Sequence, residues 1–362
     1  MSRALQGGLE TEISDDAAMN VTPIVSVMMT TYNHEKYIAD AIEGVISQKT
    51  DFPFELIIGE DCSADETRSI VLEYQRRYPG VIRVLFSERN MGAFNNSNRM
   101  FTKVRGELLA WCEADDYWND PLKLAKQVAY LRKHLGCSLV HTDYHYLVKN
   151  FGKWRLIHSR YRPNKKINLQ GKLFEPLLAD MSIRTCTMMG RTGLVKQHFE
   201  SAFRSHKYRV GDRPLVLHMS VLGDIGYIDE ATATYRRTPG SMINSGYAGL
   251  VKMQRALEEI QNDFINAFGG QDINIECLKK RNYKTLASFA FRAAMRNDFN
   301  DALAWLHKNA PDIAGNTNVK VMKYLMMSPP LWGIATRVRE IGRELDLYRR
   351  SLLSNKFACA KL

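Results

Sequence analysis

The 362-residue chain lacks several features that would assign it to a class at once. It has no run of about 18 apolar residues, so we expect no helical membrane span. Its six cysteines include no Cys-x-x-Cys pair and no Cys/His spacing of the kind that binds zinc. No Gly-x-Gly-x-x-Gly motif follows the first predicted strand, which argues against a dinucleotide-dependent dehydrogenase.

The start of the chain also lacks a secretory signal, because residues 1–22 contain no basic segment followed by an apolar core. We expect these residues to form a flexible polar leader. Several cysteines lie in apolar surroundings, as reduced thiols do, so a cytoplasmic location is expected. The net charge of +11 indicates an anionic partner. Basic runs interleaved with stacking aromatics are missing, however, so nucleic acid is not the predicted partner.

The most distinctive segment is the acidic tetrad at residues 113–116, Glu-Ala-Asp-Asp, which follows an apolar run. Three carboxylates so close together at a strand end repel one another, and a bound cation relieves that repulsion. Mg²⁺ and Mn²⁺ bind through a few carboxylates, while phosphate oxygens of a substrate complete the shell. Alternatively, Asp115 or Asp116 caps the helix that follows Pro121, which accounts for one acid but not three.

Residues 24–148 alternate between β-rich runs and amphipathic helical patterns. The alternation predicts an α/β fold with a mostly parallel, doubly wound sheet. In such sheets, ligands bind beyond the carboxyl ends of the strands. Polar clusters fall at three such ends, so we expect them to converge on one rim. These clusters are residues 30–33, 60–63 and 113–116.

The rest of the chain is less regular and then becomes helical. A strand is expected at residues 183–190, a helix at 212–222 and a strand at 225–235. Beyond residue 249, two helical patterns at 283–295 and 299–307 predict a helical hairpin. The expected organisation is a leader at 1–22, an α/β domain at 23–248 and a helical C-terminal region at 249–362.

Several motifs occur in a recognisable order, and the chain resembles family 2 of the inverting glycosyltransferases with the GT-A fold over about residues 24–245. The resemblance implies a Rossmann-like nucleotide-sugar-binding sheet. It also implies direct displacement of the nucleoside diphosphate, with inversion at the sugar carbon. The motifs are residues 25–33, 60–67, Asn90-Met91-Gly92, Gly106-Glu107 leading into the tetrad, Gly211-Asp212, residues 223–230 and Tyr235-Arg236.

The resemblance also implies roles for individual residues on the donor side. Asp61 matches the acid that accepts a hydrogen bond from the base, and a uracil ring NH suits a carboxylate. Alternatively, Asp61 and Ser63 cap the helix that begins near Asp65. The residues implied in nucleotide-sugar binding are Thr30, Tyr32, Asn33, Asp61, Asn98, Asp115 and Arg236.

Asp115, Asp116 and Glu113 are implied as metal-binding residues, with Mn²⁺ or Mg²⁺ as the divalent cofactor. The cation would neutralise charge on the departing diphosphate. Asp212 falls where the family has its catalytic base, which takes the proton of the acceptor hydroxyl. Alternatively, Asp212 caps the helix from Pro214, and one residue can do both.

Three positions depart from the family pattern. Cys62 stands where a glycine often follows the base-binding acid. Ser97 stands where many relatives have an arginine, for which Arg99 could substitute. The histidine often found after Tyr-Arg is absent, so Arg236 or Arg237 is the natural phosphate contact.

On the acceptor side, the match implies that Arg184 and Thr187 line the pocket, although the strand that carries them could equally be core. We expect a glycan or lipid-linked acceptor and a UDP-sugar donor. The rival hypothesis is a GT-A-fold scaffold or binding protein without transferase activity in a glycan-assembly complex. The rival is disfavoured by the joint presence of four acids, Asp61, Asp115, Asp116 and Asp212.

The last predicted helix, after Pro329-Pro330, has an apolar stripe. Such stripes dock on the protein's own core, form a homodimer seam or lie on a membrane surface. Residues 331–362 contain seven Lys/Arg and three Asp/Glu, a balance of +4, which favours an anionic membrane and a peripheral location at its inner face. The stripe comprises Leu331, Ile334, Val338, Ile341, Leu345, Tyr348 and Leu352.

Overall fold

The structure is a computed structural model, and the account below concerns the residues that it describes. These are residues 10–15, 19–161, 169–179, 183–208, 210–238, 246–269, 273–293, 295–314, 322 and 329–359. The chain divides into two compact units. The first contains residues 1–147, 158–206 and 211–236, and the second contains residues 148–157, 207–210 and 237–362.

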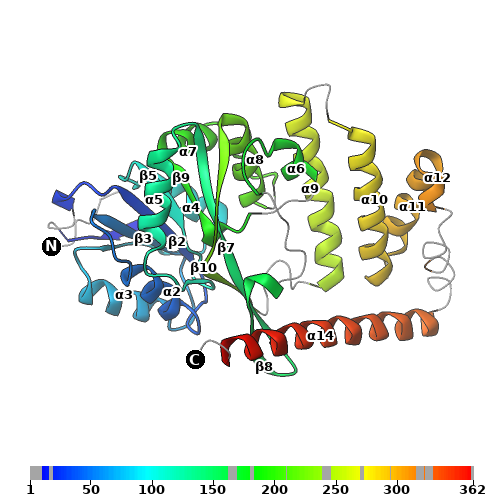
Figure 1. The fold of residues 1–362 in the computed structure, drawn as a ribbon, viewed down its shortest axis with the longest axis horizontal. Helices are drawn as coiled ribbons and strands as arrows, with labels where there is room; N and C mark the ends of the chain where they lie inside the picture. The colour runs from blue at the N-terminus through cyan, green and yellow to red at the C-terminus, as the bar shows by residue number, and fades with distance from the viewer. Residues whose placement is uncertain are drawn as a thin grey trace. The chain divides into compact units, whose positions relative to one another are not determined.

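The first unit is built on a mixed sheet whose centre is parallel (Figure 1). The strand order is β1-β4-β3-β2-β5-β9-β7-β10-β6, and β8 (Lys153–Ile157) pairs with β7. The parallel strands are β2 (Val25–Thr31), β3 (Phe54–Glu60), β4 (Ile82–Ser87) and β5 (Leu108–Trp111). The others are β1 (Glu10–Ile13), β6 (Tyr117–Trp118), β7 (Cys137–Asn150), β9 (Met188–Arg191) and β10 (Asp224–Arg237).

Helices cover the parallel strands on both faces, so these strands read as continuous apolar runs. Alternate residues of β2, such as Val25 and Val27, pack in one core with α2 (Ile38–Ile46), α3 (Thr67–Arg77) and α5 (Lys123–Lys133). On β3, Gly59 leaves room for Met100 of α4 (Gly92–Phe101), because a Cβ there would lie 2.3 Å from the Met100 sulfur. The predicted α/β fold class is therefore confirmed.

Two local predictions were wrong. Residues 10–13, within the expected flexible leader, form strand β1 antiparallel to β4, where Glu12 forms an ion pair with the buried Arg83. The strand expected at 183–190 is confined to β9, because residues 185–187 instead form a 3₁₀ helix, η2 (Thr185–Thr187). By contrast, the helix expected at 212–222 coincides with α8 (Asp212–Leu222).

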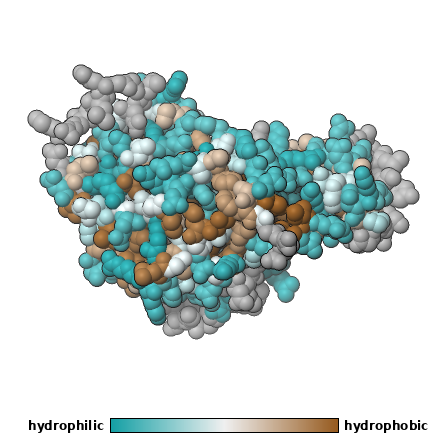
Figure 2. Space-filling model, turned by 90° about the horizontal axis from the view of Figure 1, so that it is seen from above, coloured by the Kyte–Doolittle hydropathy of each residue, from teal (hydrophilic) through white to brown (hydrophobic). Residues whose placement is uncertain are grey.

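Shorter helices complete the first unit. They are η1 (Ser159–Tyr161), α6 (Phe174–Ala179) and α7 (Thr192–Phe199). Figure 2 shows one face of the molecule, on which hydrophilic residues surround hydrophobic ones that break the surface near its middle. Among the described residues, no helix is long and apolar enough to cross a membrane.

The second unit is largely helical and has its own core. It contains α9 (Gly246–Phe268), α10 (Ile275–Arg292), α11 (Arg296–Asn309), α12 (Pro311–Ala314) and α14 (Pro329–Cys359). The predicted helical hairpin is present as α10 and α11, whose Tyr283 and Trp305 rings stack at 4.4 Å. Phe291 and Phe299 are buried between these two helices. Of the predicted stripe, the side chains of Leu331 and Ile334 lie outside the described residues.

Candidate active site

The carboxyl ends of β2, β3 and β5 lie side by side, because the three strands are parallel neighbours. Backbone hydrogen bonds continue past the strand ends. The amide of Asp61 donates to the carbonyl of Thr31 at 3.1 Å, and that of Ala114 donates to Thr30 at 3.3 Å. The three polar clusters therefore share one rim, which we call the sheet rim.

The loops after β2 and β3 are tied together by side chains. Asn33 has a positive φ of 55°, a conformation that asparagine tolerates well. Its amide donates to Ser63 Oγ at 3.0 Å, and its Oδ1 accepts from the Ala64 amide at 2.8 Å. Tyr32 beside it is 43% exposed, and Thr30 is half-buried at the end of β2. These side chains form an ordered wall, with Tyr32 open to solvent.

Asp61 is buried at the end of β3, and both of its carboxylate oxygens are engaged. Oδ1 accepts from the Met91 amide and Oδ2 from the Gly92 amide, each at 2.9 Å. These amides begin α4, so Asp61 holds the start of that helix and does not cap the helix near Asp65. Each carboxylate oxygen has two lone pairs, so acceptor capacity remains for a nucleobase NH.

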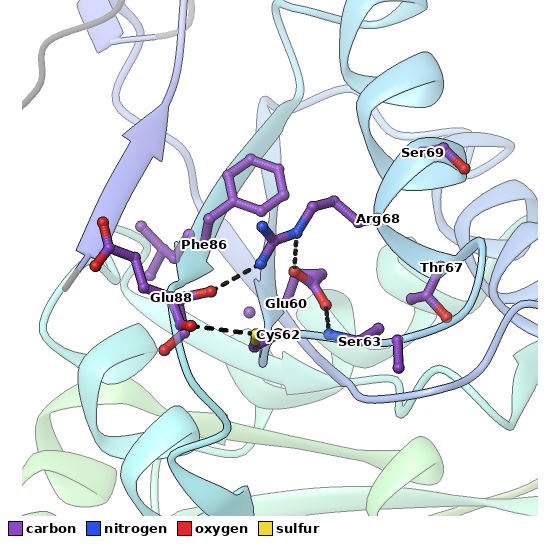
Figure 3. A network of polar contacts seen from close by, with 12 residues as sticks. Glu60, Cys62, Ser63, Thr67, Arg68, Ser69, Phe86 and Glu88 are labelled. Carbon is purple, nitrogen blue, oxygen red and sulfur yellow. Dashed lines mark hydrogen bonds and ion pairs between the residues drawn. The ribbon is translucent and has the colours of Figure 1, made fainter.

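Behind Asp61, Glu60 organises a polar network (Figure 3). Its carboxylate accepts from Arg68 Nε and from the Ser63 amide, both at 2.6 Å. Arg68 also donates to the Ser87 carbonyl, and the Cys62 thiol donates to Glu88 O at 3.3 Å. Cys62 has a φ of 62°, in the left-handed region that favours glycine.

Asn98 and Arg99 have different surroundings. Asn98 Oδ1 accepts from Arg204 Nε at 2.8 Å. Arg99 is buried and donates to three carbonyls at the strand ends, those of Glu60, Leu85 and Phe86. Its guanidinium therefore ties β3 to β4, and these contacts do not fit the expectation that Arg99 substitutes for the arginine that many relatives have in place of Ser97.

The acidic tetrad follows β5 and is poorly compensated. Asp116 is 2% exposed and accepts the Arg236 amide at 2.7 Å. Burial, together with the nearby charges of Asp115 and Glu113, raises the pKa of Asp116 well above its usual value. Burial also raises the pKa of Glu113 to about 7, despite a hydrogen bond with Thr185. One oxygen of Glu113 is buried without a hydrogen-bond partner among the described residues.

Asp212 lies in the first turn of α8, where the positive end of the helix dipole favours a carboxylate. Its charge acts on Glu113, raising that pKa, and on Arg184. The predicted base therefore lies within electrostatic reach of the tetrad, although almost a hundred residues separate them in the sequence. The Arg184 guanidinium lies 4.4 Å over the Tyr235 ring.

Thr187 is 1% exposed, and its hydroxyl donates to the Arg184 carbonyl at 2.6 Å. Its own carbonyl accepts from two buried side chains of α5, Lys123 at 3.2 Å and Gln127 at 2.9 Å. The Thr187 side chain therefore fixes the turn of η2, while Arg184 is the residue of this segment on which the charge of Asp212 acts.

Arg236 joins two parts of the rim. Its backbone contacts Asp116, as described, and its guanidinium is buried between the rings of Tyr37 and Tyr117. It forms an ion pair with Asp40 at 2.7 Å, while Nη1 has no hydrogen-bond partner within the described part of the chain.

Sequence reasoning missed two features of the site. His34 follows Asn33 directly, and the charges of Asp115 and Asp65 act on it. Tyr146 stacks on Tyr235 with their centroids 5.8 Å apart, and the charge of Asp116 acts on Tyr235. The alternation of Tyr144 and Tyr146 along β7 was the available signal, since it places both rings on one face.

The carboxylate oxygens of the tetrad suit a hard divalent cation, but they do not form a complete set of ligands. Two or three carboxylates supply oxygen ligands, and the unpartnered Glu113 oxygen and the raised pKa of Asp116 indicate charge that a cation would balance. Within the described ranges, no three His, Cys, Asp or Glu side chains are grouped so that they could hold a metal alone. A cation here would therefore need oxygens from a substrate.

Comparison with known proteins agrees with this geometry. Residues 26–196 match the family model described as Glycosyl transferase family 2. An uncharacterised protein of Mycobacterium tuberculosis is 46% identical over 110 residues, which are 30% of this chain and 32% of that protein. An uncharacterised glycosyltransferase of Haemophilus influenzae is 27% identical over 221 residues, 60% of this chain and 67% of that protein.

The match to the first curated relatives is partial, since it spans about a third of their length, 32%. Among solved structures, mannosyltransferase PcManGT from Pyrobaculum calidifontis, in complex with GDP-Man and Mn²⁺, has a TM-score of 0.51 and 15% identity, with 90% of this chain and 89% of that chain covered. This likeness concerns the fold alone. From the family match and the order of the motifs, residues 26–196 form a glycosyl transferase family 2 domain, and the chain shares its fold with that mannosyltransferase.

Proposed function

We propose that the chain is an inverting glycosyltransferase. Its donor is a nucleotide-sugar of the UDP-sugar class, and the sugar is transferred to a hydroxyl of a glycan or lipid-linked acceptor. The observation that carries this proposal is the buried Glu113, whose pKa is raised by burial and further by the charges of Asp115 and Asp212. It groups the acids of the tetrad with a carboxylate from α8. An inverting transfer needs such a pair: acids that organise the diphosphate, and a separate base on the acceptor side.

In this scheme the nucleoside lies along the wall formed by Thr30, Tyr32 and Asn33. Asp61 accepts the base NH with its remaining lone pairs, and Asn98 of α4 supplies a further polar contact. Arg236 donates a charge-assisted hydrogen bond to a phosphate oxygen through Nη1, which has no partner among the described residues. The exposed Asp40, its present partner, would then pair with water.

Asp115 and Asp116 would hold Mn²⁺ or Mg²⁺, with Glu113 as a further oxygen ligand. The cation supplies Lewis-acid stabilisation of charge on the leaving diphosphate. Asp212 takes the proton from the acceptor hydroxyl as that oxygen attacks the sugar carbon from the side opposite the diphosphate. Arg184, on which the charge of Asp212 acts, orients the acceptor, and the Tyr146–Tyr235 stack offers an apolar face for a sugar ring.

A panel of nucleotide sugars tests this proposal. With Mn²⁺ present, one UDP-sugar should be hydrolysed slowly without acceptor and turned over faster with a suitable glycan. Asp212→Asn should lower turnover with acceptor by at least about a hundredfold. The matched control is Asp224→Asn, at an exposed acid at the start of β10 that should leave turnover unchanged.

Unchanged turnover in Asp212→Asn would remove the base assignment. Binding of nucleotide sugars without turnover of any of them would instead favour the inactive scaffold.

A further inference from the structure

The second unit exposes an unusual group of apolar side chains on two adjoining elements. One is the two-residue hairpin between β7 and β8, and the other is α14. They lie side by side near the bottom of Figure 1, and α14 contacts β8. We define the hairpin–helix surface by Phe151, Trp154, Val338, Ile341, Leu345 and Leu352, each at least 40% exposed.

The hairpin has a residue that folding alone does not favour. Phe151 has a φ of 47° and Gly152 a φ of 77°, so both turn residues are in the left-handed region. Tight hairpins place Asn, Asp or Gly at such positions, and a bulky aromatic is strained there. Phe151 is nevertheless 60% exposed. A strained residue that gains little burial indicates a use outside the fold.

Helix α14 uses one face for its own unit and leaves another open. Leu347 and Ser351 are buried, and the Tyr348 ring contacts both the Phe151 ring and the Arg155 guanidinium. Beside that packed face, Val338, Ile341 and Leu345 are more than half exposed. Their spacing by three and four residues aligns them as a stripe, which Leu352 continues.

The charges around these apolar groups are mainly basic. Residues 148–157 contain Lys149, Lys153 and Arg155 and no acid. By helical spacing, Arg337 and Arg349 lie at the two edges of the α14 stripe. Glu344 is the acid at the Arg337 edge, and it accepts a hydrogen bond from Asn150 at 2.6 Å. Apolar side chains flanked by cations match a surface whose headgroups are anionic and whose interior is apolar.

We propose that the hairpin–helix surface docks on an anionic lipid membrane, with Phe151 and Trp154 inserted at the headgroup level beside the α14 stripe. The inference deepens the proposed function, because a lipid-linked acceptor lies at such a surface. The sequence analysis considered membrane contact through the C-terminal helix only. Here the membrane-binding surface also includes the hairpin, which supplies the aromatic anchors. Vesicle binding is measured without turnover, so failure here leaves donor hydrolysis untouched.

The test is flotation of the full chain with vesicles of phosphatidylglycerol mixed with phosphatidylcholine, or of phosphatidylcholine alone. The wild type should float with the anionic vesicles and release at high salt. A variant with Phe151→Asn, Trp154→Gln, Ile341→Gln and Leu345→Gln should bind at least tenfold more weakly. Asparagine suits the left-handed turn position, so that variant should remain folded.

Matched controls come from the first unit. Leu135→Gln removes an apolar side chain that is 80% exposed elsewhere and should change nothing. Lys153→Glu should weaken binding about fivefold, while Lys133→Glu, at another exposed lysine, should not.

Three results would overturn the proposal. They are no flotation of the wild type, equal flotation with phosphatidylcholine alone, and unchanged binding by the four-residue variant. Sedimentation that shows a dimer lost in that variant, without vesicle binding, would assign the surface to a second copy of the chain.

Discussion

The two ends of the sheet rim treat their carboxylates in opposite ways. After β3, Glu60 and Asp61 each accept two hydrogen bonds from the protein itself. After β5, Asp116 is buried with its pKa raised by burial and neighbouring acids, and one Glu113 oxygen lacks a partner in the described part of the chain. The first end is already organised, whereas the second groups acids whose charge a bound cation would balance.

The largest difference between the two ends of the sheet rim is expected from substitution of Asp116. In Asp116→Asn we expect kcat/KM with Mn²⁺ to fall by at least about a hundredfold, because a charged ligand of the cation is lost. The check is steady-state kinetics over a range of Mn²⁺ concentrations, with Asp224→Asn as control. A variant that keeps the wild-type dependence on Mn²⁺ would place the metal elsewhere.

The stability of the metal-free protein should separate the two ends. Asp61→Asn should lower the free energy of unfolding by about 2 to 3 kcal/mol, because two backbone amides lose a charged acceptor. Asp116→Asn should not lower it, since the amide oxygen still accepts from Arg236 and the repulsion is gone. Urea unfolding with a chelator checks both. Equal destabilisation by both variants would contradict the contrast.

The buried His198 of α7 should make the stability of the protein depend on pH. Burial, with His218 and Arg204 nearby, lowers the pKa of His198 to about 3. The folded state keeps this ring neutral while the unfolded state protonates near pH 6.5, so stability is full above that pH and declines as pH falls toward about 3. At pH 5 the loss from this ring is about 2 kcal/mol.

Urea unfolding at pH 8 and pH 5 checks this prediction. His198→Phe should lose less stability between the two values than the wild type does. Equal losses would mean that the His198 ring does not contribute to the pH dependence.

The smallest effect is expected at Cys62. Glycine adopts the φ of 62° found at Cys62 without strain. It would, however, make the unfolded chain more flexible and remove the hydrogen bond from the thiol to Glu88 O. Cys62→Gly should therefore change stability by less than about 1 kcal/mol, with nucleotide affinity retained. A larger loss, measured by urea unfolding, would mean that the thiol itself holds the turn.

The sequence predicted the parts of the fold that depend on local pattern. Buried apolar runs identified the parallel strands, and the start of α8 at Asp212 followed from its helical spacing. Strand β1 was missed, because four residues pair there through the tertiary contact of Glu12 with Arg83. The role of Arg99 was missed for the same reason, since the carbonyls that it binds come from two other strands.

Within the site, motif order brought Asp61, the tetrad and Asp212 to attention. It could not indicate which carboxylates are already satisfied, since the partners of Asp61 lie 30 and 31 residues away. Nor could it place His34 near Asp115, which depends on how the loop after β2 turns. The assignment of roles therefore remains a prediction that ligand binding must test.

The central claim is that the β5 end of the rim binds a cation together with the donor diphosphate. Isothermal titration of UDP, with Mn²⁺ and with a chelator in its place, tests this most directly. We predict affinity at least about tenfold higher with Mn²⁺, because the cation bridges the acids and the phosphate oxygens. Equal affinity under both conditions would contradict the account.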